Sequence, residues 1–320
     1  MKAGVLVTRK VFPEVLDQLS RRFAVEHNPD DRPWPPAELA SRLAGKAAAL
    51  ATVMDRFDEA ILEAAPGLKV IANIAVGYNN IDVAACTKRG IRVTNTPGVL
   101  DDTTADLTWA LLMSAARRTA EADAWVRRGD WKVAFALDSF LGADVHHATL
   151  GIIGMGRIGQ AVARRAAGFE MRVLYNNRSR LAEAEEKRLN ATRVERGELL
   201  AQADFVVVMA PYSPATHHLI GAPEIAMMKP GAILVNSARG GVVDDAALVA
   251  ALEAGRIAGA GLDVFEGEPK LHPGYFRLPN VVMTPHIGSA SRATRLRMSL
   301  TACANLEAVL AGGVPANPVN

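Results

Sequence analysis

Short apolar runs alternate with amphipathic stretches along most of the chain. In the first hundred residues the pattern predicts strands at 5–7, 48–53, 70–74 and 91–94, with helices at 11–20, 59–64 and 83–89. Loops are expected at Pro33, Pro35 and Pro36, and at Pro66 and Gly67. Strands that alternate with helices in this way are typical of a parallel α/β sheet.

A second, longer series of the same kind occupies the middle of the chain. Its strands are expected at 150–153, 172–175, 205–209, 232–236, 257–263 and 281–284. An amphipathic helix over 102–118 precedes this series and a helical run over 291–310 follows it, so each is a candidate crossing between domains. The sequence therefore predicts an α/β protein of two Rossmann-like, doubly wound parallel-sheet domains with a cleft between them. The expected domains are 1–101 plus 289–320, which would bind the substrate, and 102–288, which would bind a dinucleotide.

Composition narrows the function classes. A length of 320 residues suits two domains that each bury a core. The net charge is only +2, and the basic residues are scattered along helical stretches, which argues against a nucleic-acid surface. Two cysteines allow no disulfide framework and no metal-ligand spacing, so we expect no metal and a reducing cytoplasm. No apolar stretch approaches the length of a membrane span.

A glycine motif provides the clearest chemical signal. Gly154, Gly156 and Gly159 follow the strand expected at 150–153 and open a helical pattern that continues to Gly168. In this strand-turn-helix setting, G-x-G-x-x-G lets the backbone approach a pyrophosphate and lets the helix pack on the strand. The helix N-terminus then offers N–H groups to the phosphates. This unit predicts a dinucleotide site, and the alternative is a structural glycine turn in an ordinary βα unit.

The residues after the next strand bear on the choice of cofactor. NAD-binding units carry an acid about twenty positions beyond the glycines, where it binds the adenine ribose. This chain has Asn177, Arg178 and Ser179 there, followed by Arg180. These side chains suit a 2′-phosphate, so NADP(H) is the preferred cofactor and NAD(H) remains possible. A surface loop with incidental arginines is the alternative.

Chemically useful side chains lie at the ends of three later strands. Arg239, Asp263 and His286 each end or follow a strand, and such positions share the rim of a doubly wound sheet. His286 is placed to exchange a proton, while Glu268 would hold its imidazole and favour the charged form. Arg239 suits a carboxylate because its fork binds two oxygens. The other six histidines, at 27, 146, 147, 217, 218 and 272, read as structural or surface residues.

Three long motifs resemble one family. The stretches VGYNNID (76–82), NSARGGVVDDAAL (236–248) and AGLDVFEGEP (260–269) followed by TPHIGSAS (284–291) are similar to those of the D-isomer-specific 2-hydroxyacid dehydrogenases. The resemblance spans essentially the whole chain. It is greatest to the branch of glyoxylate/hydroxypyruvate reductases and 2-ketogluconate reductases.

The resemblance implies a role for each matched position. Arg239 would orient the substrate carboxylate and carbonyl, with His286 as acid/base and Glu268 as its partner. The substrate carboxylate would contact the backbone at Val76 and Gly77, and Ser289 would border the pocket. The cofactor contacts implied are Arg157 and Ile158 at the pyrophosphate, Ser237 and Gly288 along the nicotinamide half, and Asp263 at the carboxamide.

The expected activity is reduction of a small 2-oxo acid, glyoxylate or hydroxypyruvate, to the D-2-hydroxy acid by hydride transfer from NAD(P)H. Two alternatives stay open: a 2-ketogluconate reductase of the same branch, and a non-catalytic, corepressor-like protein that senses dinucleotide. The resemblance also implies a homodimer, with residues 131–141, including Phe140, reaching the partner. Neither the preferred acid nor the physiological direction follows from the sequence.

Overall fold

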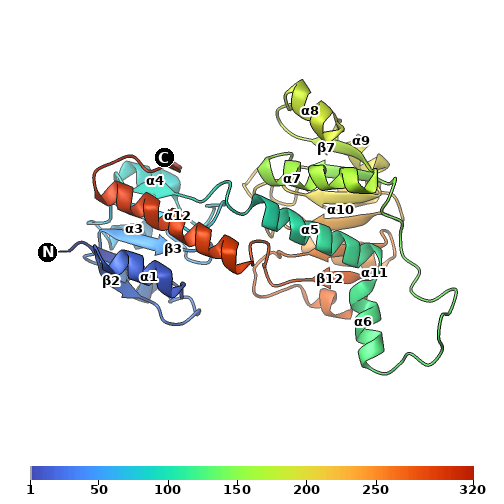
Figure 1. Cartoon of the computed structure of the whole chain (residues 1–320), viewed down its shortest axis with the longest axis horizontal. Helices are drawn as coiled ribbons and strands as arrows, with labels where there is room; N and C mark the ends of the chain where they lie inside the picture. The colour runs from blue at the N-terminus through green and yellow to red at the C-terminus, as the bar shows by residue number, and fades with distance from the viewer. Residues whose placement is uncertain (1) are drawn as a thin grey trace. The chain divides into compact units, whose positions relative to one another are not determined.

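The computed structural model describes residues 2–320, and within them the chain forms two compact units, each built on a parallel sheet (Figure 1). One unit consists of Met1–Leu100 and Ala290–Asn320, and the other of Asp101–Ser289. In the described part of the chain, no helix is both long enough and apolar enough to cross a membrane.

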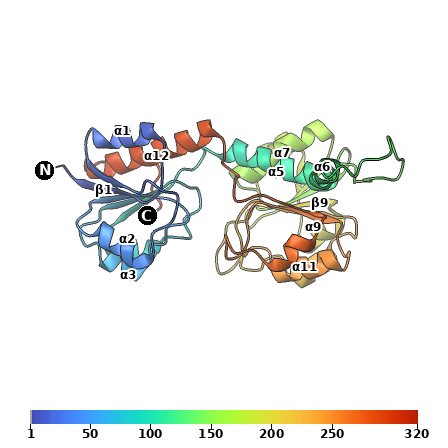
Figure 2. The ribbon, with the colours of Figure 1, turned by 90° about the horizontal axis from the view of Figure 1, so that it is seen from below.

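The sheet of the first unit has the order β2-β1-β3-β4-β5. Its strands are β1 (Gly4–Val7), β2 (Ala24–His27), β3 (Ala48–Ala51), β4 (Val70–Asn73) and β5 (Arg92–Thr94). Its helices are α1 (Pro13–Ser20), α2 (Pro36–Leu43), α3 (Glu59–Glu63), α4 (Val83–Lys88) and α12 (Arg292–Leu310). Alternate residues of the central strands enter two cores: one lies under α1 and α12, the other under α2, α3 and α4 (Figure 2).

Two elements of this unit do not follow from the sequence pattern. β2 is an edge strand whose four residues are exposed or half-exposed, so it lacks the apolar run that marks a buried strand. The expected loop at Pro36 is wrong, because Pro36 is the first residue of α2. Proline is tolerated there since the first N–H of a helix has no partner within the helix.

The second unit contains the longer sheet, with the order β12-β11-β10-β9-β6-β7-β8. Its strands are β6 (Thr149–Ile153), β7 (Arg172–Asn176), β8 (Ala191–Arg193), β9 (Phe205–Val208), β10 (Ile233–Asn236), β11 (Gly259–Leu262) and β12 (Val281–Met283). The order reverses between β6 and β9, which is the switch point where doubly wound sheets bind ligands. The sequence-based prediction of a doubly wound α/β fold is confirmed.

Helices cover both faces of this sheet. They are α5 (Asp101–Ala116), α6 (Thr119–Arg127), α7 (Arg157–Ala166), α8 (Glu183–Leu189), α9 (Arg196–Gln202), α10 (Ala222–Met227) and α11 (Asp245–Glu253), with 3₁₀ turns η1 (Ala167–Phe169) and η2 (Pro273–Arg277). In β9, Phe205 and Val207 pack in the core with α5 and α7, whereas Val206 and Val208 pack with α9, α10 and α11. Burial on both faces explains why these strands read as continuous apolar runs.

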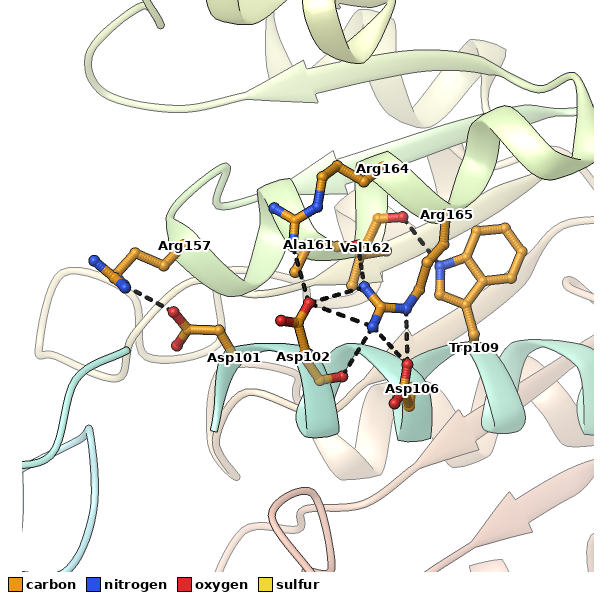
Figure 3. A network of polar contacts seen from close by, with 9 residues as sticks. All are labelled: Asp101, Asp102, Asp106, Trp109, Arg157, Ala161, Val162, Arg164 and Arg165. Atoms are coloured by element: carbon orange, nitrogen blue, oxygen red, sulfur yellow. Dashed lines mark hydrogen bonds and ion pairs between the residues drawn. The ribbon is translucent and has the colours of Figure 1, made fainter. Parts of the chain in front are cut away.

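Ion pairs join α5 to α7 (Figure 3). The pairs are Asp101 with Arg157, Asp102 with Arg164, and Asp106 with Arg165. Trp109 adds a buried hydrogen bond, its Nε1 donating to the Val162 carbonyl at 3.0 Å. The helix predicted at 102–118 therefore belongs wholly to the second unit rather than bridging the two. The ion pairs made by α5 fix the position of the N-terminus of α7.

Candidate active site

The glycine turn between β6 and α7 is built for close backbone approach. Gly154 has a φ of +102°, and a Cβ there would lie 2.6 Å from Ala210 N. A Cβ on Gly159 would lie 2.4 Å from the Gly154 carbonyl oxygen. At Gly156, which caps α7, a Cβ would have no neighbour within 4 Å in residues 2–320, so this side of the turn is open. The turn therefore fits a pyrophosphate that approaches the backbone directly.

The first turn of α7 supplies the donors for such a ligand. The N–H groups of Arg157, Ile158 and Gly159 begin the helix, where no carbonyl of the preceding turn can accept from them. Arg157 is largely exposed, and its Nε donates to Asp101 at 2.8 Å. That bond leaves the two Nη groups of Arg157 for an anionic ligand (Figure 3).

The loop after β7 lies next to this turn, because Gly154 N donates to the Asn176 carbonyl at 3.0 Å. Asn177 comes next, where NAD enzymes carry an acid, and Arg193 from β8 donates to its carbonyl at 3.3–3.4 Å. Arg178 is exposed and makes no ion pair within residues 2–320. Arg178 and Arg193 therefore give the loop a positive charge, and Arg193 is a residue that the sequence analysis missed.

Arg180 has a different role from Arg178. Its guanidinium donates to both oxygens of Glu186, from Nε at 3.0 and 3.1 Å and from Nη2 at 2.8 Å. This hydrogen bonding, together with that from the Tyr175 hydroxyl, lowers the pKa of Glu186. Arg180 is thus part of a structural ion pair.

Two of the three predicted catalytic side chains are in direct contact. His286 Nδ1 lies 2.6 Å from Glu268 Oε1, and both side chains are about one quarter exposed. Phe265 N donates to the other Glu268 oxygen at 3.3 Å, which fixes the carboxylate. Because Nδ1 is held by Glu268, Nε2 is the ring nitrogen left to exchange a proton with a substrate.

Asp263 organises the loop that carries His286. Its buried carboxylate accepts from Thr284 Oγ1 at 2.6 Å, from Ile287 N at 2.7 Å and from Gly288 N at 2.8 Å. The His286 N–H donates to the Asp263 carbonyl, and His286 itself has a φ of +53°. Burial raises the pKa of Asp263, while the bond from Thr284 opposes the rise. The described hydrogen bonds of the Asp263 carboxylate are therefore to this loop, and its predicted contact with a carboxamide stays a prediction.

Arg239 follows β10 and has no carboxylate within salt-bridge distance among residues 2–320. Its Nη1 donates to the carbonyl of Ala238 at 2.7 Å, and its own carbonyl accepts from Asn236 Nδ2. Burial lowers the pKa of Arg239, whereas the nearby charge of Glu268 raises it. The Arg239 guanidinium is half-buried near the Glu268–His286 pair and has no anionic partner of its own in residues 2–320. Such a guanidinium is suited to bind the carboxylate of a substrate.

The other predicted positions divide between the units. Ser237 is buried, with its Oγ 2.6 Å from Thr108 Oγ1 on α5. Gly288 is buried and Ser289 half-buried, both in the second unit. Val76 and Gly77 lie in the loop after β4, in the first unit.

A pair of histidines predicted to be structural or surface residues meets an acid. His218 Nε2 lies 2.8 Å from Glu266 Oε2, and this hydrogen bond raises the pKa of His218. The rings of His217 and His218 stack 3.9 Å apart with only 24° between their planes. Since a metal ion prefers to lie in the plane of each imidazole that binds it, this arrangement suits an ion pair better than a shared metal.

A family model agrees with this site. The model described as "D-isomer specific 2-hydroxyacid dehydrogenase, NAD binding domain" matches residues 109–288, which span the glycine turn, Arg239, Glu268 and His286.

Curated relatives and solved structures match the chain over its full length. A glyoxylate reductase of Thermococcus onnurineus is 48% identical over 323 residues, covering 100% of this chain and 96% of the relative. A glyoxylate reductase structure from Paecilomyes thermophila has a TM-score of 0.89 at 32% identity, covering 99% and 98% of the two chains. An NADPH-dependent glyoxylate/hydroxypyruvate reductase from Sinorhizobium meliloti, solved with NADP and malonate, has a TM-score of 0.89 at 33% identity, covering 100% and 97%.

Proposed function

The chain belongs to the D-isomer specific 2-hydroxyacid dehydrogenase family and reduces a 2-oxo acid with a nicotinamide dinucleotide, and on this premise we propose that its substrates are glyoxylate and hydroxypyruvate and its preferred reductant NADPH. One observation carries the assignment of the site: His286 and Glu268 form a 2.6 Å pair beside a guanidinium, Arg239, that has no anionic partner in residues 2–320. A proton donor and a carboxylate anchor are what reduction of a 2-oxo acid requires.

Each side chain has a defined part in the reaction. The nicotinamide, when bound, supplies the hydride. Arg239 binds the substrate carboxylate with its fork and orients the carbonyl. His286 donates a proton from Nε2 to the carbonyl oxygen, while Glu268 at Nδ1 holds the ring in place. By the resemblance, Val76 and Gly77 bind the carboxylate and Ser289 borders the pocket.

For the cofactor, we assign the pyrophosphate to the turn at Gly154, Gly156 and Gly159 and to the start of α7 at Arg157 and Ile158. The nicotinamide half is assigned to Ser237, Asp263 and Gly288.

The activity is tested by following the absorbance of NADPH as it is oxidised in the presence of each acid. We expect turnover with glyoxylate and hydroxypyruvate, and a higher kcat/KM for these than for 2-ketogluconate or pyruvate. A preference for 2-ketogluconate would reassign the enzyme within its branch. No turnover with any of these acids and either cofactor would overturn the proposal.

Cofactor choice is tested at Arg178. Charge-assisted hydrogen bonds contribute about 1.5–3 kcal/mol each, so Arg178→Ala should lower kcat/KM for NADPH by roughly ten- to a hundredfold. The value for NADH should change little, because NADH lacks the 2′-phosphate. Arg172→Ala is a matched control, since it removes an exposed arginine at the start of β7, the strand that precedes the loop with Arg178. Equal use of both cofactors by the wild type would show that Asn177, Arg178 and Ser179 do not select the phosphate.

We further propose a homodimer that uses the segment after α6. Five of its large apolar side chains are more than half exposed: Trp131, Val133, Phe135, Leu137 and Leu141. Exposed apolar groups in this number are typical of an interface. Phe140 packs on its own chain, with its ring 5.3 Å from that of Trp125 and 5.2 Å from the Arg118 guanidinium, and its predicted contact with the partner stays a proposal.

A cytoplasmic location remains our proposal. The thiols of Cys86 and Cys303 are both buried, and burial raises their pKa values to about 11 and 12. Buried thiols of this kind are unreactive and pack in the core. Free thiols are what a reducing compartment, such as the cytoplasm, maintains.

A further inference from the structure

We infer that Asn73 and Asn95 are positioning residues that aim two backbone N–H groups, those of Gly77 and Tyr78, at the carboxylate of the substrate. The inference rests on the proposed function, which places the carboxylate at this loop. The resemblance assigns the carboxylate to the backbone at Val76 and Gly77, whereas the hydrogen bonds of this loop favour the N–H groups of Gly77 and Tyr78 as the two donors.

The loop from Ala75 to Tyr78 has all its carbonyl groups occupied. Two of them accept from backbone N–H groups: Ala75 O from Thr96 N at 2.8 Å, and Tyr78 O from Ile81 N at 3.0 Å. The two in between accept from asparagine side chains: Val76 O from Asn95 Nδ2 at 2.8 Å, and Gly77 O from Asn73 Nδ2 at 2.9 Å. Both asparagines come from strand ends, Asn73 from the end of β4 and Asn95 just after β5.

The N–H groups of the same loop are in the opposite situation. In residues 2–320, those of Val76, Gly77 and Tyr78 donate to no protein group. In a trans peptide, the C=O of one residue and the N–H of the next point in opposite directions. When Asn95 holds the Val76 carbonyl, the Gly77 N–H therefore points away from Asn95. When Asn73 holds the Gly77 carbonyl, the Tyr78 N–H points away from Asn73. Two adjacent N–H groups without a protein acceptor in residues 2–320 are suited to the two oxygens of a carboxylate.

The energetics of Asn73 favour a functional role. Its side chain is fully buried, yet its Oδ1 has no hydrogen-bond partner within residues 2–320. An unpaired buried carbonyl oxygen destabilises the fold, so stability alone does not explain an asparagine at this position. Its amide is nevertheless held in place, because Asn80 Oδ1 lies 3.5 Å from Nδ2 and Asn80 is itself bonded to the carbonyls of Thr52 and Asp55.

The test compares Asn73→Ala and Asn95→Ala with the wild type on two substrates, glyoxylate and glycolaldehyde, which lacks the carboxylate. We expect the KM for glyoxylate to rise about tenfold in each variant, while kcat falls less than threefold. The KM values for glycolaldehyde and for NADPH should stay within twofold. Calorimetric titration of the NADPH complex with oxamate, an unreactive carboxylate, should show a similar tenfold weakening.

Asn28→Ala is the matched control. Asn28 is also a buried asparagine of the first unit, with its Nδ2 bonded to the carbonyls of Thr8 and Arg32 at 3.1 and 3.0 Å. Asn28→Ala should change neither the KM for glyoxylate nor the KM for glycolaldehyde, even if it lowers the melting temperature. Asn95 is half-exposed, so its variant keeps the test informative if Asn73→Ala does not fold.

The possible failures can be told apart. If the wild type reduces no 2-oxo acid, the proposed function is at fault. If the wild type is active but both variants keep its KM for glyoxylate and its affinity for oxamate, the positioning role is wrong. An equal rise in KM for glyoxylate and glycolaldehyde would also overturn it, because that result indicates a general disturbance of the unit.

Discussion

Replacing His286 with alanine is expected to lower kcat for glyoxylate reduction by about 10²- to 10⁴-fold, the usual contribution of a positioned proton donor. The reason is the geometry of the His286–Glu268 pair, in which Glu268 Oε1 lies 2.6 Å from His286 Nδ1. Nε2 is then the nitrogen that protonates the substrate carbonyl. The change should leave cofactor binding intact, because His286 is not among the residues assigned to the dinucleotide. Steady-state kinetics and titration of NADPH fluorescence measure the two quantities separately.

His147→Ala serves as the control for this substitution. His147 also has a carboxylate near its Nδ1, from Glu170 at 3.4 Å, but both side chains are mostly exposed and lie outside the site. It should keep the wild-type kcat. Retention of near wild-type turnover by His286→Ala would require another residue to be the acid.

The second large effect is expected at Arg239, where lysine should lower kcat/KM for every 2-oxo acid by roughly a hundredfold. An ammonium keeps the charge but cannot bind both carboxylate oxygens in one plane. The guanidinium would make two charge-assisted hydrogen bonds of about 1.5–3 kcal/mol each to the carboxylate. Lysine keeps part of this binding energy because it keeps the charge. Affinity for NADPH should change little. Initial rates over a series of 2-oxo acids provide the comparison.

Arg256→Lys tests whether any half-buried arginine is equally sensitive. Arg256 belongs to the same unit and, among residues 2–320, donates only to the backbone carbonyls of Ala226 and Met228, so its variant should keep full kcat/KM. If the wild type reduced glycolaldehyde as well as glyoxylate, capture of the carboxylate by Arg239 would not select the substrate.

Much of the fold and the chemistry is visible in the sequence because each has a local signal. Fully buried strands such as β9 appear as apolar runs, and the glycine spacing marks the turn after β6. His286 and Arg239 could be identified as candidates because ligand-binding side chains of doubly wound sheets follow the ends of strands. The family motifs assigned them their roles.

Other features depend on contacts between distant residues and have no local signal. β2 is half-exposed at an edge, so its four residues resemble a loop. Arg180 and Arg178 look equivalent in the sequence, and only the fold brings Glu186 to the first of them. Arg193 is remote in the sequence from Asn177 but adjacent to it in the sheet. The side-chain amides of Asn95 and Asn73, which donate to the Val76 and Gly77 carbonyls, likewise come from the ends of two different strands and have no shared local signal.

The three hydrogen bonds to the Asp263 carboxylate have a consequence for the energetics of turnover. They immobilise residues 284–288 before any ligand arrives, and the left-handed backbone of His286 is held by bonds from its N–H to the carbonyls of Asp263 and Thr284. The entropy lost in ordering the proton donor is therefore part of the free energy of folding. Little reorganisation of this loop is needed as the transition state forms, so the binding energy of the substrate remains available for aligning its carbonyl.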